Sequence, residues 1–166
     1  LTAARAAAQK HFGNKDIVKD FFRPYVYLDR DLLAAAKVSR SRAATAIANE
    51  LARIDGIDTR IPDSGRDLPV ARAIDHNHHS QRSGDIYVFQ QPYWFLMEGS
   101  TIAVMHGSPW EYDRHVPLIF MGKHMQAQRV KRRVHLVDVA PTLSALVGIL
   151  APAGAQGKPL IEVLAD

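Results

Sequence analysis

The sequence predicts an α/β fold. Three observations support it: short apolar segments with strand character alternate with helical segments, residues 25–61 have the pattern of a strand–helix–strand unit, and residues 85–90 are apolar on both faces. A strand that is apolar on both faces belongs in the middle of a covered sheet. The chain has 166 residues, which is enough for one domain with a hydrophobic core.

Helices are predicted where alanine and other apolar residues recur at helical spacing. Serine or aspartate at the start and glycine after the end mark their boundaries. The predicted helices cover residues 1–12, 31–36, a segment from Ser39 or Ser41 to Gly56, residues 68–76, and a segment from Asp138 to about Val147. In the last helix we expect one apolar side to face the core, formed by Val139, Leu143, Leu146 and Val147.

Strands are predicted in short runs that are rich in β-branched and aromatic residues. They cover residues 25–29, 57–61, 85–90 and 116–122, with a further strand or its approach at 129–136. Segment 116–122, VPLIFMG, is expected to be buried, with Pro117 at the start of the strand or on an edge because proline cannot donate to the sheet.

Composition and charge exclude several kinds of protein. The chain has no cysteine, which excludes disulfides, thiolate zinc sites and cysteine nucleophiles. No apolar run approaches the roughly 18 residues that cross a bilayer, so no membrane segment is predicted. The net charge of +4 is modest, and we interpret the basic run RVKRR, 129–133, as a solvated face. Nucleic-acid binding is the alternative, but no aromatic stacking pattern or recognition helix accompanies the run.

Two places in the sequence could bind a metal ion. The first is DHNHH, 75–79, with three histidines and one aspartate. Neighbouring side chains diverge on helices and strands alike, and tetrahedral sites draw their ligands from separated segments. We therefore interpret the Asp75–His79 cluster as an exposed polar loop that could pick up metal adventitiously.

The second place is His106, which stands between the apolar run TIAVM and a Gly-Ser-Pro turn. Glycine at position 107 lets the backbone pass close to a bound group, so His106 could serve as one metal ligand or as one acid–base group. A structural role is the alternative, and packing or hydrogen bonding is expected for His115. A Ser108–His106–Asp113 triad is rejected, because nothing in the sequence presents the serine hydroxyl.

Residues 106–122, HGSPWEYDRHVPLIFMG, resemble the final metal-ligand segment of the alkaline phosphatase superfamily. The resemblance is strongest to the single-threonine phosphatases and the type I phosphodiesterase/nucleotide pyrophosphatases. Met105 and Trp110 depart from the usual threonine and tyrosine. Three other segments also resemble the family: YVYLDRDLL, 25–33, RSGDIYV, 82–88, and residues 137–160. The matching positions in the first segment are His106, Gly107, Ser108, Pro109, Tyr112, Asp113, Val116, Pro117, Phe120 and Gly122.

The resemblance implies a particular fold. We expect the chain to be the C-terminal part of an alkaline-phosphatase-like sandwich with a small strand–helix–strand insert. Residues 1–166 would form a single truncated domain, with the insert at about 20–80 and the C-terminal part of the core sheet at 82–166. The missing strands would leave apolar edges exposed around 85–90 and 116–120, so we expect self-association through these edges.

The resemblance also implies a function. The family uses two zinc ions and a threonine or serine nucleophile to hydrolyse phosphate mono- or diesters. His106 corresponds to the last zinc ligand in chain order, whereas the nucleophile and the other ligand motifs are not found in this sequence. We therefore expect the C-terminal portion of a zinc-dependent phosphate-ester hydrolase, with no catalytic residue of its own and no activity alone.

Further expectations concern the protein in the cell. Because the chain begins at Leu1 rather than methionine, we expect it to be a processed product or an excised fragment. The family implies a periplasmic or secreted location and a phosphate-ester substrate, and from the residues themselves we expect neither nucleic acid nor membrane as a partner. The alternative is a non-catalytic binding or interaction domain that retains the fold.

Overall fold

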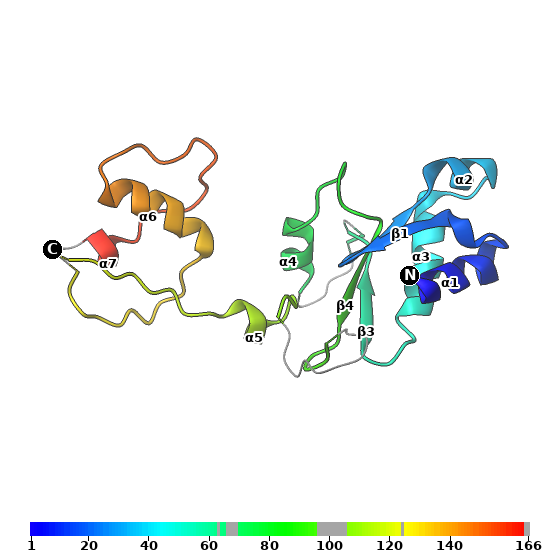
Figure 1. Ribbon diagram of the computed structural model, residues 1–166, viewed down its shortest axis with the longest axis horizontal. Helices are drawn as coiled ribbons and strands as arrows, with labels where there is room; N and C mark the ends of the chain where they lie inside the picture. Colours follow the sequence, from blue (N-terminus) through cyan, green and yellow to red (C-terminus); the bar gives the residue numbers. More distant parts are fainter. Residues whose placement is uncertain (63, 66–69, 96–105, 124, 165–166) are drawn as a thin grey trace. The chain divides into compact units, whose positions relative to one another are not determined.

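The computed structural model describes residues 1–62, 64–65, 70–95, 106–123 and 125–164. The chain divides into two compact units, Leu1–His115 and Val116–Asp166, and each is described by itself (Figure 1). The mixed α/β class predicted from the sequence is confirmed. The division into an insert at about 20–80 and a core part at 82–166 stays a prediction.

The first unit contains a four-stranded sheet in which every neighbouring pair is antiparallel. Its order is β1–β2–β4–β3, with bounds β1 (Val18–Phe22), β2 (Tyr25–Leu28), β3 (Ile57–Arg60) and β4 (Ile86–Gln90). The sequence predicted β2, β3 and β4 but missed β1, where Lys19 and Asp20 interrupt the apolar pattern. The inner place of β4 agrees with its apolar character on both faces.

The expected exposed apolar edge at 85–90 is wrong. Residues Ile86 to Phe89 are buried, because β4 has a neighbouring strand on each side. The edges of this sheet are β1 and β3.

The helices of the first unit largely confirm the sequence prediction. They are α1 (Thr2–Phe12), η1 (Lys15–Ile17), α2 (Arg30–Ala35), α3 (Arg40–Leu51), α4 (Ala71–His76) and α5 (Glu111–Arg114). Ser39 caps α3 by accepting a hydrogen bond from the Arg42 N–H at 3.2 Å. The helix ends at Leu51, five residues before the Gly56 that was expected to stop it. The predicted start of α4 at Leu68 lies outside the described residues.

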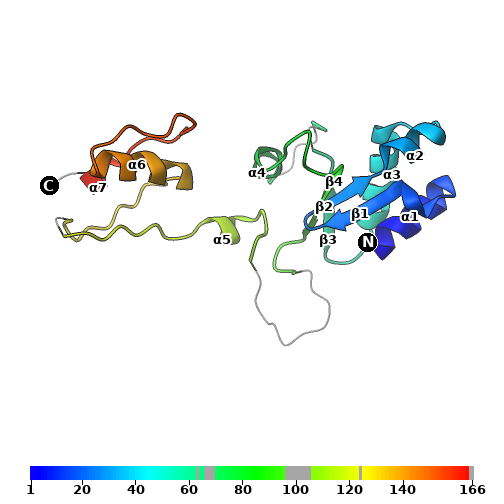
Figure 2. The same ribbon diagram turned by 45° about the horizontal axis from the view of Figure 1, so that its top comes forward.

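The two faces of the sheet carry two separate apolar clusters, as the alternation of side chains along strands requires. On one face Val26, Ile86 and Val88 pack with buried residues of α1 and α3. On the other face Tyr25, Tyr87 and Phe89 pack with Val70 and Ile74, next to α4. Figure 2 shows α1, α2 and α3 on one side of the strands and α4 on the other.

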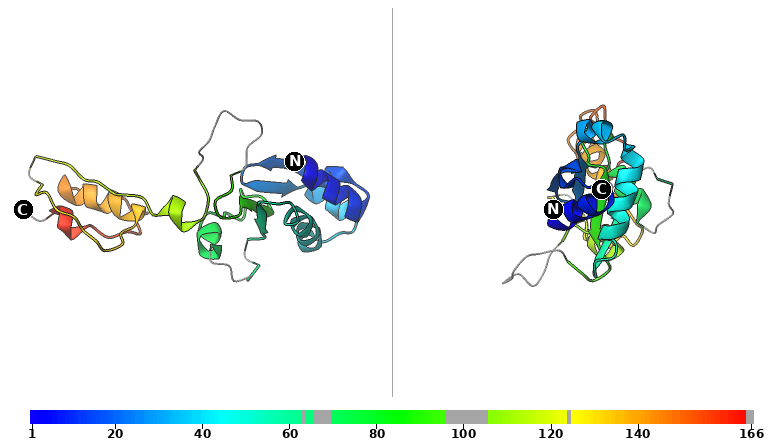
Figure 3. Two further views of the ribbon diagram at one scale, coloured as in Figure 1. Left: turned by 90° about the horizontal axis from the view of Figure 1, so that it is seen from below. Right: turned by 90° about the vertical axis from the view of Figure 1, so that its right-hand side faces the viewer.

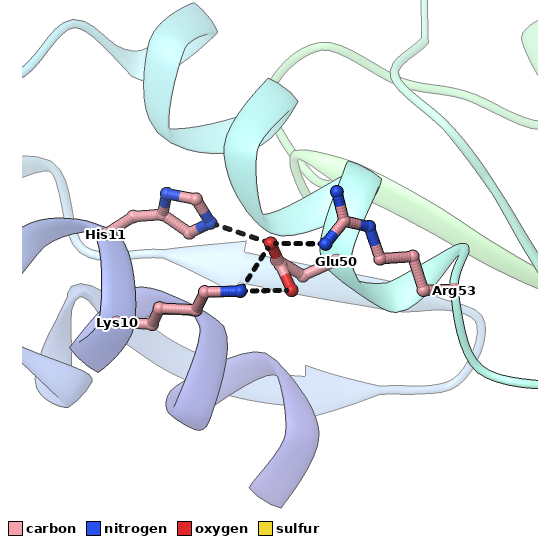
Figure 4. A network of polar contacts seen from close by, with 4 residues as sticks. All are labelled: Lys10, His11, Glu50 and Arg53. Atoms are coloured by element: carbon pink, nitrogen blue, oxygen red, sulfur yellow. Dashed lines mark hydrogen bonds and ion pairs between the residues drawn. The ribbon is translucent and has the colours of Figure 1, made fainter.

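Helices α1 and α3 pack through alanines and are joined at the surface by a polar network (Figure 4). Glu50 of α3 receives hydrogen bonds from Lys10 Nζ at 3.0 Å and pairs with His11 Nε2 at 3.0 Å and Arg53 Nη1 at 3.4 Å. The bond from Lys10, followed by that from His11, lowers the pKa of Glu50. Because the network is exposed, we expect little net stabilisation from it.

Both edges of the sheet have backbone groups bound by side chains. On β1 the Phe21 N–H donates to Asp20 Oδ1 at 2.7 Å, and the Arg5 guanidinium donates to the carbonyl oxygens of Val18 and Lys19. On β3 the Thr59 N–H donates to Asp58 Oδ1, also at 2.7 Å. Occupied groups of this kind make an edge a poor template for another strand.

The second unit is built around α6 (Val139–Leu146), with η2 (Leu136–Asp138) before it and α7 (Ile161–Leu164) after it (Figure 3). Asp138 was expected to cap α6, but its carboxylate instead accepts the N–H groups of His135 and Lys158, each at 2.9 Å. The buried Thr142 hydroxyl donates to the Asp138 carbonyl and accepts the Leu160 N–H. These bonds fasten the 149–160 segment to the start of the helix.

Two further sequence predictions are wrong in this unit. Residues 116–122 and 129–136 form no strand in the described structure, and Ile119 and Met121 are 82% and 95% exposed. The expected core-facing side of α6 is also largely exposed, at Leu143, Leu146 and Val147. The buried positions of α6 are Pro141, Thr142 and Ser144, and the Thr142 hydroxyl accepts the Leu160 N–H of the returning 149–160 segment. The exposed apolar side chains of this unit find no apolar surface among the described residues that would bury them.

None of the helices in the described part of the chain has the length and hydropathy needed to cross a bilayer.

Candidate functional site

The candidate site is the turn that carries His106, in the first unit. His106 is exposed, and its ring makes no hydrogen bond among the described residues. Gly107 follows with φ of 97°, a left-handed conformation that strongly favours glycine. Ser108 and Pro109 are buried, and the chain then enters the short helix α5. The apolar run 101–105 that precedes the turn lies outside the described residues.

A carboxylate closes the turn. Asp113 Oδ2 of α5 accepts the backbone N–H of Ser108 at 2.8 Å. The Ser108 hydroxyl lies beside the same carboxylate, but its geometry falls short of a hydrogen bond, and its oxygen is buried with no partner among the described residues. The Ser108 hydroxyl, the Ser108 N–H and then the charge of His106 lower the pKa of Asp113. The structural contact between Asp113 and the turn is therefore the bond to the Ser108 backbone.

Trp110 fastens the turn to the sheet. Its indole Nε1–H donates to the Gln90 carbonyl at 2.7 Å, at the end of β4. Its ring lies 6.1 Å from that of Phe89, between centroids, and packs against the apolar cluster next to α4. The turn is thus held both by the aromatic cluster and by the last residue of an inner strand.

A second aromatic contact joins α5 to the segment after β4. The Tyr93 and Tyr112 rings are stacked at 5.1 Å between centroids with an interplanar angle of 15°. The Tyr93 N–H donates to the Tyr112 hydroxyl at 3.0 Å, and Tyr93 has φ of 67°, which is unusual outside glycine. The stacking and the hydrogen bond together fix the orientation of the exposed Tyr112 side chain.

The structure gives no support to a Ser108–His106–Asp113 triad. It brings Ser108 and Asp113 together through the serine backbone, and it buries the hydroxyl that would have to reach a substrate. His115 is exposed rather than packed, and its backbone N–H closes α5 by donating to Glu111 at 2.8 Å.

The Asp75–His79 cluster was interpreted as a loop, but Asp75 and His76 form the end of helix α4, and only the residues after them lie outside the helix. Asp75 receives two hydrogen bonds from the buried Arg60, at 3.0 and 2.6 Å. His78 lies against the Tyr25 ring, and His79 Nδ1 accepts the Gln81 N–H at 3.3 Å. The side chains of Asp75, His78 and His79 are therefore engaged with the protein itself.

The R-S-G-D segment also proves to be structural. Asp85 is buried, accepts the Leu28 N–H at 2.7 Å, and pairs with Arg40. A Cβ atom at Gly84 would lie 2.5 Å from the Val26 carbonyl oxygen, so the strands approach too closely for a side chain. The sequence pattern singled out this segment, but the two side-chain bonds of Asp85 span 45 and 57 residues and therefore leave no local signal.

Comparisons with known proteins decide the family. No family model matches the chain. Alkaline phosphatase PafA of Elizabethkingia meningoseptica is 29% identical over 164 residues, which cover 96% of this chain and 30% of that protein. The crystal structure of wild-type alkaline phosphatase PafA matches with a TM-score of 0.85 and 28% identity, over 99% of this chain and 32% of that one. The chain belongs to the alkaline phosphatase superfamily.

A third relative bears another name. A protein of Myroides odoratus named calcium-transporting ATPase is 27% identical over 158 residues, which cover 92% of this chain and 29% of that protein. The chain thus spans about a third of the length of the curated relatives it matches.

Membership of the alkaline phosphatase superfamily implies a bound metal, and the described residues do not make a complete site for one. No group of three or more histidine, cysteine, aspartate or glutamate side chains in the described ranges could hold an ion. A zinc site needs three or four protein ligands. The exposed imidazole of His106 fits the part of one ligand, and the others would have to come from elsewhere.

In this superfamily member the basic run 129–133 forms an exposed segment rather than a strand. Arg132 pairs with Glu162 of α7, with Nη2 and Oε2 at 2.7 Å, and Gln128 Nε2 donates to the Glu162 carbonyl at 2.6 Å. The Arg132 guanidinium is the main cause that lowers the pKa of Glu162 to about 2.

Replacing Arg132 by glutamine is expected to raise the pKa of Glu162 from about 2 toward its ordinary value of 4.5. The pair stabilises the fold above pH 4.5, and that contribution is lost as the pH falls from 4.5 toward 2. A ¹³C NMR titration of the Glu162 carboxyl measures the change. Lys131→Gln, which removes a neighbouring exposed charge, is the control and should leave the midpoint in place. Equal midpoints in Arg132→Gln and the unaltered chain would contradict the pairing.

Proposed function

We propose that this chain is the C-terminal portion of a zinc-dependent phosphate-ester hydrolase, and that His106 supplies one ligand to its metal site. The observation that carries the proposal is the similarity to alkaline phosphatase PafA over 96% of the chain. The imidazole of His106 is exposed and makes no hydrogen bond to the residues that the structure describes, and its turn is fixed by Asp113 and Trp110, which supports the role of a ligand. The substrate class would be phosphate mono- or diesters, and the location periplasmic or secreted.

The second unit supports the view that other parts of a hydrolase cover this chain. Its exposed large apolar residues outnumber its buried ones, since Leu160 is the one buried large apolar residue in the part of this unit that the structure describes. We propose that these side chains pack against the rest of an alkaline-phosphatase-like sandwich. The exposed residues are Val116, Ile119, Met121, Val130, Leu136, Val137, Leu143, Leu146, Val147, Ile149, Leu150 and Ile161. Self-association of the chain alone stays a prediction.

The test compares the 166-residue chain with the natural gene product that contains it. Hydrolysis of p-nitrophenyl phosphate is measured with added zinc and with a chelator. We expect no turnover by the chain alone, and zinc-dependent turnover by the natural product. His106→Ala in the natural product should lower kcat/KM by more than the 10–100-fold that loss of a group behind a metal ligand costs.

His115→Ala is the matched control, because it removes an exposed histidine from the same segment. It should leave kcat/KM unchanged. Equal rates in His106→Ala and His115→Ala would remove the assigned role of His106. Zinc-dependent turnover by the chain alone would show that it carries a site of its own. A natural product without any hydrolysis would favour the binding domain that retains the fold.

A further inference from the structure

We infer that Asp113 is a positioning residue that holds the His106 turn in the conformation in which the imidazole meets its metal. The inference rests on the proposed role of His106 as a ligand. The direct contact is the hydrogen bond from the Ser108 N–H to Asp113 Oδ2 at 2.8 Å. It binds the backbone two residues beyond the imidazole to a helix that starts at Glu111.

The backbone of the turn is not fixed by its own sequence, so it needs a contact such as the one with Asp113. Gly107 has φ of 97°, a conformation that glycine adopts readily but does not prefer over its alternatives. Without further bonds the chain at this point would therefore sample several directions for the His106 side chain. A carboxylate that accepts the Ser108 N–H at 2.8 Å restricts these directions, because it ties the backbone next to Gly107 to one point.

Asp113 is itself held in place by its neighbours in α5. The N–H groups of Asp113 and Arg114 donate to the Trp110 carbonyl at 3.1 and 3.2 Å, so the carboxylate and the indole belong to one short turn of helix. The Trp110 indole is bonded to Gln90, and its ring packs next to Phe89. A continuous path of contacts thus leads from the inner strand β4 through Trp110 and Asp113 to the backbone next to His106.

The Ser108 hydroxyl completes the arrangement. Its oxygen is buried and has no hydrogen-bond partner among the described residues, although it lies beside the Asp113 carboxylate. A buried hydroxyl without a partner is costly, and a rotation about its Cα–Cβ bond toward the carboxylate would satisfy it. Asp113 therefore has a second donor available from the same residue that it already binds.

The experiment uses two variants of Asp113 and one control. Asp113→Ala removes the acceptor, whereas Asp113→Asn keeps one oxygen for the Ser108 N–H. Arg114→Ala changes the exposed neighbour in the same helix and serves as the control. The first readout is hydrogen exchange of the Ser108 amide by NMR in the 166-residue chain, with no metal present. We expect exchange to become roughly tenfold faster in Asp113→Ala and to change little in Asp113→Asn and Arg114→Ala.

The second readout is the zinc affinity of the natural gene product, measured by competition with a chelating dye. We expect a 10–100-fold loss in Asp113→Ala, a partial recovery in Asp113→Asn, and no change in Arg114→Ala. Unchanged exchange at Ser108 in Asp113→Ala would overturn the inference whatever the zinc affinity. Faster exchange with unaltered zinc affinity would also overturn it, while a loss of zinc in His106→Ala would leave the proposed function standing. Unaltered affinity in both His106→Ala and Asp113→Ala would overturn both.

Discussion

Replacing Phe89 by alanine is expected to lower the free energy of unfolding by about 3–5 kcal/mol. Phe89 lies on the inner strand β4, is 2% exposed, and is the largest side chain among the fully buried ones that the structure describes. Its loss removes apolar area from the cluster next to α4 and leaves a cavity that a sheet cannot close by moving. Chemical denaturation of the 166-residue chain, followed by circular dichroism, measures the change.

The same substitution should also reach the candidate site. The Trp110 ring packs next to Phe89, so its indole N–H should exchange faster with solvent once Phe89 is truncated. Phe89→Leu is the matched control, because it keeps most of the volume and should cost less than about 1.5 kcal/mol. If Phe89→Ala destabilised the fold without any change at the Trp110 indole, the turn would not depend on this cluster.

Replacing Asp85 by alanine is expected to lower the free energy of unfolding by about 2–3 kcal/mol. The main cause is the Leu28 N–H, which is buried and would lose its acceptor at 2.7 Å. The pair with Arg40 adds less, because the arginine side chain is about half exposed at 47%. Urea denaturation of the 166-residue chain measures the difference in the free energy of unfolding between the variant and the unaltered chain.

Asp85→Asn separates the two causes. Asparagine can keep an oxygen at the Leu28 N–H while it removes the charge that faces Arg40. We expect it to cost less than half of what alanine costs. An asparagine variant as unstable as the alanine variant would mean that the charge on Asp85, rather than the buried hydrogen bond, stabilises this part of the sheet.

The sequence predicted those parts of the fold that depend on neighbours along the chain. Helix α1 ends where Gly13 adopts the left-handed conformation, α3 starts at the Ser39 cap, and β4 is apolar on both faces because it lies inside the sheet. Each of these features is decided within a few residues. The order of the strands was not predictable in this way, since it depends on contacts between distant segments.

The errors at residues 116–122 and on the apolar side of α6 have another physical origin. An apolar pattern shows that burial of those side chains is favourable, but it does not say which surface buries them. Ile119, Met121 and Val147 are exposed because the described residues offer no such surface. Under the proposed function, the rest of the hydrolase would provide it.

The candidate site was only partly predictable for a similar reason. The residues of the Gly-Ser-Pro turn gave a clear pattern, so His106 could be singled out. From the sequence, Asp113 was named only as a rejected triad member and as a position that matches the family segment. Its bond to the Ser108 N–H was not predicted, because a hydrogen bond from a loop N–H to a side chain five residues later has no periodicity. The signal that could have found it is an aspartate soon after a Gly-Ser pair, at the start of a short helix. The role of His106 itself needs ligands from separated segments, which one histidine cannot reveal.

Backbone groups on both edge strands of the four-stranded sheet have side-chain partners, and this affects how the sheet can fit into a larger protein. Asp20 and Asp58 each occupy an N–H of their own edge strand, and Arg5 occupies carbonyl groups of β1. A sheet finished in this way does not require a neighbouring strand from its host. We expect such a sheet to be tolerated within a larger protein without forming unwanted strand pairs at its edges.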